Sequence, residues 1–248
     1  MNRHKVSFCS EFAKPLDARQ FQREGYAIVE RGISESELAS LRQACDTLLA
    51  EPVDDGGGAR HRIGLGKRRR FLAHRHESFP KVENLLLKGS VASLASRLLQ
   101  PECYLFNEQF VVKGAGDGAS FAWHQDGAYV GFDHQPYISI WIALDDANVE
   151  NGCLRIIPRD LESRGYIDRH RWSEESRELC GYDGEDSGVP VTCAAGAVVL
   201  FSSLTLHCSG RNATPNLRRA FLAQYSKEPI SDPDTGKLKR FAKNVSRN

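Results

Sequence analysis

The chain has 248 residues, 33 Lys and Arg against 32 Asp and Glu, and a formal net charge of +1. A hydrophobic content of 41% is too high for a disordered chain. With a mean hydropathy of -0.43 and no apolar run near the roughly 18 residues that span a bilayer, the sequence excludes a transmembrane helix. The balanced charge also argues against a nucleic-acid-binding or membrane-binding protein.

Cysteine usage and the start of the chain bear on the cell compartment. The seven cysteines include no CxxC pair, so neither a disulfide framework nor a structural zinc site is expected. The first fifteen residues lack the apolar stretch of a secretory signal. We therefore expect a cytoplasmic location. The sequence contains nothing that sets an oligomeric state.

The first predicted elements are a short helix, a strand and a longer helix. Residues 21–30 end in an apolar, β-branched run, which predicts a short strand after a brief helix. Ser34 and Glu37 form a capping-box pattern, and apolar residues then recur at helical spacing. The spacing predicts an amphipathic helix over 34–50.

A basic, glycine-rich stretch separates these elements from two more helices. Residues 54–70 combine five glycines with a basic cluster and are typical of a loop. Leucine-rich helical patterns follow at 80–88 and 90–99, and Pro101 stops the second.

Beyond Pro101, short segments rich in β-branched and aromatic residues alternate with turn residues. The predicted strands are 103–113, 119–124, 137–144, 153–157, 196–201, 204–208 and 217–225. This spacing predicts one mainly β domain over 1–248, a sandwich or barrel with N-terminal helices. Its expected parts are a helical layer over about 1–100, a core over about 101–226, a lid or insertion at 160–190 and a polar tail at 227–248.

Two histidines and an aspartate form a candidate metal site. His124 and Asp126 stand two residues apart at the end of a predicted strand, where residues i and i+2 share a face. His207 lies near the end of a later strand and could complete a triad of two histidines and one carboxylate. Such a triad suits non-haem iron(II), because it leaves coordination positions open. The pattern of His124 and Asp126 alone is common by chance.

Consecutive arginines open the last predicted strand. On the strand period of two, Arg218 and Arg219 point to opposite faces, so one of them should enter an apolar interior. A buried guanidinium needs an anion, and a metal-bound dicarboxylate would supply one. The alternative is that both arginines are exposed on an edge strand.

Four stretches, in order and at closely similar spacing, resemble the phytanoyl-CoA dioxygenase family over about residues 18–226. The stretches are His124-Gln125-Asp126, WIALDDA from Trp141, NGCLRIIP from Asn151, and His207-Cys208-Ser209-Gly210 followed by Arg218. No segment resembles a binding site for the coenzyme A nucleotide, so the resemblance supports the cofactor chemistry more than an acyl-CoA substrate.

The resemblance implies a double-stranded β-helix core, that is, a cupin-like jelly-roll, and an oxygenase that uses iron(II), 2-oxoglutarate and O2. It implies that His124, Asp126 and His207 bind iron and that Arg218 binds the distal carboxylate of 2-oxoglutarate. Further family positions near the cosubstrate are Gln125, Trp141, Ser209 and Lys113. Asp126 argues against halogenation, because halogenating relatives have a small residue at that position.

Hydroxylation of a small organic substrate is the expected reaction, with desaturation, epimerisation and cyclisation as alternative outcomes of the same chemistry. A non-catalytic metal-binding or 2-oxoglutarate-binding cupin is a further alternative, although a structural metal site needs no buried Arg218. A nucleic-acid demethylase ranks last because the chain lacks a broad basic footprint.

Two segments are candidates for substrate contact. Residues 60–76 carry seven Lys and Arg residues and no acidic residue: Arg60, Arg62, Lys67, Arg68, Arg69, Arg70 and Arg75. Such a run is usually a solvated loop; the alternative is that it lies at the active-site mouth and favours an anionic substrate. The 160–190 segment offers Tyr166, Trp172 and Tyr182, which either contact substrate or attach the segment to the barrel.

Overall fold

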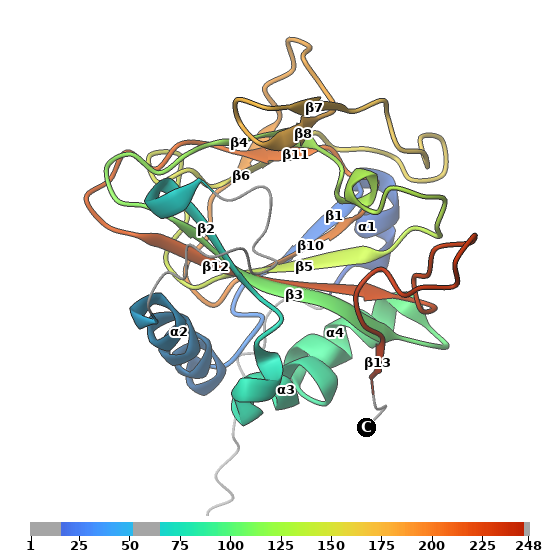
Figure 1. Cartoon of the computed structure of the whole chain (residues 1–248), viewed down its shortest axis with the longest axis horizontal. Helices are drawn as coiled ribbons and strands as arrows, with labels where there is room; N and C mark the ends of the chain where they lie inside the picture. The colour runs from blue at the N-terminus through green and yellow to red at the C-terminus, as the bar shows by residue number, and fades with distance from the viewer. Residues whose placement is uncertain (1–15, 52–64, 246–248) are drawn as a thin grey trace, which may run out of the picture.

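Two antiparallel sheets face each other in the computed structural model of the chain, which describes residues 16–51 and 65–245 (Figure 1). The larger sheet has the order β1-β10-β5-β12-β3-β13, with β2 also paired to β3. Its strands are β1 (Tyr26–Val29), β2 (Arg69–Ala73), β3 (Tyr104–Lys113), β5 (Ile138–Ala143), β10 (Val198–Ser202), β12 (Arg218–Ser226) and β13 (Lys243–Asn244).

The smaller sheet has the order β4-β11-β6-β9 and lies opposite the larger one. Its strands are β4 (Phe121–His124), β6 (Leu154–Ile156), β9 (Val189–Val191) and β11 (His207–Ser209). A separate hairpin of β7 (Arg171–Ser173) and β8 (Glu178–Cys180) lies beside this sheet (Figure 1). The two facing sheets confirm the mainly β, jelly-roll fold.

Helices α2 (Glu35–Ala50), α3 (Pro80–Leu87) and α4 (Ser90–Leu99) cover the outer face of the larger sheet, whereas α1 (Ala18–Glu24) lies beside β1 (Figure 1). The 3-10 turns are η1 (Gly66–Arg68), η2 (His76–Ser78) and η3 (Asp126–Tyr129). Ser34 caps α2 and Glu37 bonds back to it, as the capping-box pattern predicted. None of the helices in the described ranges is long and apolar enough to cross a membrane.

Two hydrophobic clusters lie on the two faces of the larger sheet. One cluster joins the sheet to the helices and includes Leu41, Leu86 and Ile140. The other joins the two sheets and includes Ile156 and Val199. Each large apolar side chain removed from water contributes about 1.5–3 kcal/mol. The helices therefore pack on one face of the larger sheet, and the smaller sheet packs on the other face, where the site lies.

Most of the predicted elements are confirmed, and the differences lie in the loops. The basic loop predicted at 54–70 lies partly outside the described residues, and its end is wrong because strand β2 begins at Arg69. The strand predicted at 204–208 begins only at His207. Within the predicted polar tail at 227–248, β13 pairs with β3, so this short part of the tail belongs to the larger sheet.

Candidate active site

The predicted metal ligands His124, Asp126 and His207 meet on the inner face of the smaller sheet. His124 ends β4, His207 begins β11, and these two residues are register partners. One ligand atom from each of the three residues lies within 4.8 Å of the others, and all three side chains are buried. Asp126 Oδ1 lies 3.4 Å from His124 Nε2 and 3.6 Å from His207 Nε2.

The convergence of His124 and Asp126 has a different cause from the one predicted. We expected the two side chains to share a face of one strand, but β4 ends at His124. Asp126 belongs to the η3 turn, and this turn brings its carboxylate back toward the histidines.

Both histidines are held in the tautomer that suits metal binding. His124 Nδ1 lies 2.8 Å from the Ala122 carbonyl oxygen, and His207 Nδ1 lies 3.0 Å from that of Thr205. With Nδ1–H donating to a carbonyl, each Nε2 offers a lone pair toward Asp126. Burial and the neighbouring His124 lower the pKa of His207 to about 4, so its imidazole is neutral at physiological pH.

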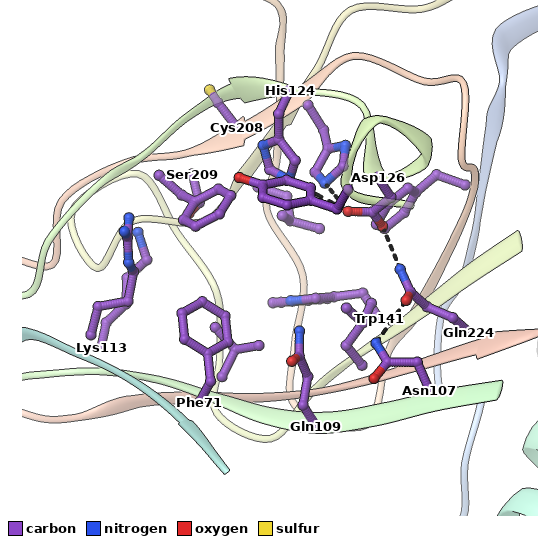
Figure 2. Close-up of a pocket in the computed structure, with 18 of the residues that line it drawn as sticks. Phe71, Asn107, Gln109, Lys113, His124, Asp126, Trp141, Cys208, Ser209 and Gln224 are labelled. Carbon is purple, nitrogen blue, oxygen red and sulfur yellow. Dashed lines mark hydrogen bonds and ion pairs between the residues drawn. The ribbon is translucent and has the colours of Figure 1, made fainter. Parts of the chain in front are cut away.

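The Asp126 carboxylate is oriented by a chain of buried polar side chains. Its Oδ2 accepts hydrogen bonds from Ser139 Oγ at 2.5 Å and from Gln224 Nε2 at 3.0 Å. Gln224 Oε1 in turn accepts from Asn107 Nδ2 at 2.7 Å (Figure 2). Burial alone would raise the pKa of Asp126, but His207, His124 and the hydrogen bond from Ser139 lower it on balance. The residue is therefore an ionised carboxylate whose Oδ1 faces the histidines.

Three cations stand side by side on the inner face of the larger sheet. The register pairs Arg69 of β2 and Arg218 of β12 with the same residue of β3, Lys113. All three are at most 1% exposed. Arg69 bonds to Glu178 at 2.8 Å and is thereby neutralised. Lys113 and Arg218 have no carboxylate within ion-pair distance among the described residues, so the positive charge of Arg218 is unbalanced at this end of the site.

Arg218 is the buried member of the arginine pair. Its Nη2 donates to the Gly152 carbonyl at 3.1 Å, whereas Nε and Nη1 have no partner among the described residues. Burial lowers the pKa of Arg218 to about 10, and burial together with Arg218 lowers that of Lys113 to about 6. Arg219 points the other way and pairs with Asp145 at 2.7 Å.

A glycine holds the turn that faces Arg218. Gly152 has a φ of 75°, and a Cβ there would lie 2.2 Å from the Gly210 carbonyl oxygen. This close approach places two carbonyls beside the cations, because the Gly152 carbonyl accepts from Arg218 and that of Gly210 accepts from Lys113 Nζ.

A cavity of about 500 Å³ between the sheets connects the triad with the cations. Trp141, Ser209 and Lys113 line it, as the family positions suggested. Gln125 does not: its amide donates to the carbonyls of Tyr166 and Leu204, and its oxygen accepts from the Asp168 backbone. The structure therefore places the Gln125 side chain among the neighbouring loops and not in the cavity lining, and its contact with the cosubstrate stays a prediction.

The basic run at 60–76 does not form one solvated loop. Arg60 and Arg62 lie outside the described residues. Arg69 is buried and paired, whereas Arg75 forms an ion pair with Glu51 at 2.7 Å. The run is therefore divided: Lys67 and Arg68 are exposed, whereas Arg69 lines the cavity.

The 160–190 segment reaches the cavity through its hairpin. Trp172 lines the cavity and is 38% exposed. Tyr182 instead contacts the Trp123 ring, with centroids 6.1 Å apart, and so attaches the segment to the smaller sheet. Tyr166 is 56% exposed and is not part of the lining.

Sequence reasoning missed several polar residues that line or support the site. They are Asn107, Gln109, Ser139, Gln224, Lys239 and Arg240. For the residues of β3 and β12 a signal was present: Asn107, Gln109 and Lys113 share one face of β3 with Val111, and Gln224 shares a face of β12 with Arg218.

The donor set fits iron(II) and 2-oxoglutarate. Two neutral imidazoles and one carboxylate are the ligands of non-haem iron(II) oxygenases, and they leave positions for a chelating cosubstrate. Arg218 lines the same cavity, and its guanidinium, with two nitrogens that have no partner among the described residues, is a suitable donor group for a carboxylate.

Comparisons with known proteins agree with this chemistry. The chain is 28% identical over 232 residues to the ectoine dioxygenase of Sphingopyxis alaskensis, covering 84% of this chain and 75% of that protein. It is also 28% identical over 209 residues to the methylphosphonate hydroxylase of Gimesia maris, covering 84% and 78%. The crystal structure of EvdO2 from Micromonospora carbonacea in complex with 2-oxoglutarate superposes with a TM-score of 0.69 at 28% identity, covering 89% of this chain and 95% of that one.

The sequence model of the phytanoyl-CoA dioxygenase family matches residues 21–220, which is most of the chain. The protein therefore belongs to the phytanoyl-CoA dioxygenase family and is an iron(II)- and 2-oxoglutarate-dependent oxygenase.

Proposed function

We propose that the protein hydroxylates a small anionic organic molecule, with His124, Asp126 and His207 as iron ligands and Arg218 as the anchor of 2-oxoglutarate. The observation that carries this proposal is the buried Arg218 guanidinium, with two unpartnered nitrogens, on the same cavity as the triad. A purely structural metal site would not require such a cation, which argues against a non-catalytic cupin.

When bound, iron(II) and 2-oxoglutarate supply oxidation by O2 that is coupled to decarboxylation of 2-oxoglutarate to succinate. The residues of the chain bind and orient. Arg218 neutralises the distal carboxylate and Lys113 lies beside it as a hydrogen-bond donor, while Ser209 and Trp141 also line this part of the cavity. Gln224 and Ser139 hold Asp126 Oδ2, so that Oδ1 remains for the metal.

The cavity wall excludes water from the reacting atoms. Apolar side chains come from both sheets: Phe71, Val111, Phe121, Leu154, Phe201 and Leu222. We propose that the β7–β8 hairpin is the lid of this cavity, because Trp172 lines it and Glu178 is tied to Arg69. A dry site favours oxidation of the bound substrate over side reactions.

Two observations support a small anionic substrate. The cavity lining contains five basic residues, Arg69, Lys113, Arg218, Lys239 and Arg240, against one acidic residue, Asp126; of the five, Arg69 is paired with Glu178. Relatives of this chain are named for small molecules, among them methylphosphonate and ectoine. Desaturation, epimerisation or cyclisation would use the same iron and cosubstrate contacts.

We also propose a cytoplasmic location, because the described cysteines are all free.

The test is turnover of 2-oxoglutarate to succinate by protein reconstituted anaerobically with iron(II) and then exposed to O2. We expect turnover in the unaltered protein, none in His124→Ala, and a strongly raised KM for 2-oxoglutarate in Arg218→Met. The proposal is wrong if the reconstituted protein holds no iron, or if succinate forms equally well in His124→Ala.

A further inference from the structure

A second cationic group lies at the end of the cavity away from Arg218. After β12 the chain returns along the edge of the larger sheet, and β13 pairs with Tyr104 and Leu105 at the start of β3. Just before β13, Lys239 and Arg240 line the cavity. Lys113 stands at the other end of β3, roughly 20 Å from Asn107 along the strand.

The contacts of these two cations place them near Asn107. Arg240 Nη1 lies 3.1 Å from His74 Nε2, and the same nitrogen of His74 lies 2.8 Å from Asn107 Oδ1. Lys239 Nζ donates to the Val130 carbonyl at 2.5 Å. Figure 2 shows Lys113 and Asn107 on opposite sides of the cavity.

Neither cation is balanced by a carboxylate. Within the described ranges, no Asp or Glu oxygen lies within 4.0 Å of the charged nitrogens of Lys239 or Arg240. The one acidic residue of the cavity lining, Asp126, faces the two histidines. Burial, with Arg240 nearby, lowers the pKa of Lys239, as expected for adjacent cations that lack a counter-charge.

Gln109 adds an unused polar group between the two ends. Its side chain projects into the cavity from the middle of β3 (Figure 2), and the residue is only 7% exposed. Its Oε1 has no hydrogen-bond partner among the described residues. The amides of Asn107 and Gln224, in contrast, bond to each other. A buried, unpaired amide on a cavity wall is costly unless a ligand completes its hydrogen bonds.

We infer that Lys239 and Arg240 form the subsite that binds the anionic group of the substrate, and that Gln109 hydrogen-bonds the substrate between this subsite and the iron. The inference rests on the proposed function, in which 2-oxoglutarate occupies Arg218 and Lys113. The group recognised is an oxyanion, either a carboxylate or a phosphorus oxyanion, since a guanidinium and an ammonium bind both. The subsite thus replaces the 60–76 run as the origin of anion preference.

The experiment measures anion binding to protein that already holds iron(II) and 2-oxoglutarate under anaerobic conditions. The probes are methylphosphonate, inorganic phosphate and acetate, titrated by calorimetry at constant ionic strength with chloride as the background salt. The visible absorption of the iron(II)–2-oxoglutarate complex is recorded in the same samples. The variants are Arg240→Gln and Lys239→Gln, with Lys237→Gln, an exposed lysine of the same segment, as the matched control.

We expect at least one probe to bind the unaltered protein. Comparing methylphosphonate and phosphate with acetate distinguishes a phosphorus oxyanion from a carboxylate as the preferred group. Arg240→Gln should weaken that binding about 10- to 100-fold, because a hydrogen bond to a charged group contributes about 1.5–3 kcal/mol. Lys237→Gln should leave it unchanged, and all variants should bind 2-oxoglutarate normally. Lys239→Gln provides an independent test if Arg240→Gln does not fold.

Two results would overturn the inference while leaving the proposed function intact. One is that no probe binds although the iron(II)–2-oxoglutarate absorption is present. The other is that the folded variants bind the probes as tightly as the unaltered protein. If the absorption itself does not develop, the proposed function fails, and the inference fails with it.

Discussion

Replacing Arg218 with Met should stabilise the protein in the absence of 2-oxoglutarate and remove most of its affinity for 2-oxoglutarate. The guanidinium is 1% exposed, and two of its nitrogens lack partners among the described residues. Each unsatisfied buried polar group costs about 1–3 kcal/mol, whereas the single hydrogen bond to the Gly152 carbonyl contributes about 1 kcal/mol. Met fills a similar volume without a charge, so the cosubstrate-free protein should gain about 1–3 kcal/mol.

The loss of cosubstrate affinity should be larger than the gain in stability. Removing one partner of a buried charge pair costs about 2–5 kcal/mol. The Kd for 2-oxoglutarate should therefore increase by a factor of about 30 to several thousand. Urea unfolding of the iron- and cosubstrate-free protein measures the first effect. Calorimetric titration of 2-oxoglutarate into the anaerobic iron(II) protein measures the second.

Arg219→Met is the matched control, because Arg219 lies on the other face of the same strand. It would lose hydrogen-bonded ion pairs to Asp145 and Asp46, both at 2.7 Å. It should therefore destabilise the protein by about 1–3 kcal/mol and leave the 2-oxoglutarate affinity unchanged. If Arg218→Met destabilises the cosubstrate-free protein as much as Arg219→Met does, Arg218 is a structural cation and our reasoning is wrong.

Three further predictions concern the neighbours of this cation and of the metal site. Burial lowers the pKa of Lys113 from 10.5 to about 6 in the folded protein. Between pH 6 and pH 10.5 the folded protein therefore binds one proton fewer at Lys113 than the unfolded chain does. Stability should therefore rise with pH over this range by up to ~1.4 kcal/mol per pH unit, and Lys113→Met should flatten the slope measured by urea unfolding. Gln224→Leu removes a donor to Asp126 and should weaken iron(II) binding about 10- to 100-fold in a direct titration; an unchanged affinity would show that Ser139 suffices. Glu178→Gln removes the charge that pairs with Arg69 and should destabilise the protein by about 3–5 kcal/mol in urea unfolding, whereas a loss below ~1 kcal/mol would contradict a buried ion pair.

The inward arginine could be predicted from a local signal, whereas the metal triad, with its distant His207, could be predicted through the resemblance to a known family. His124 and Asp126 are two residues apart, and the alternation of a strand separates Arg218 from Arg219. The strand period of two predicts that one of these two arginines faces the interior, and Arg218 is the one that is buried. The iron-ligand and cosubstrate roles of these residues stay predictions until the loaded protein is measured.

Other parts of the site could not be predicted because their partners are distant in sequence. Arg69 lies in a run of basic residues that favours solvation, and only a carboxylate 109 positions later, Glu178, makes its burial favourable. Arg240 lies in a segment that looks like a polar tail, and it reaches the cavity because β13 pairs with β3. Single-sequence patterns contain no information about such pairings.

The pairing of distant strands in the larger sheet also determines when the site can form. Strand β1 pairs with β10, about 170 residues later, and β3 pairs with β12, which carries Arg218. Contacts between such distant segments form slowly, because long loops must close first. During synthesis, His124 and Asp126 emerge well before His207, so the nascent chain cannot hold iron with its full ligand set until the last third of the chain is present. Stable iron capture therefore reports that β11 has paired with β4.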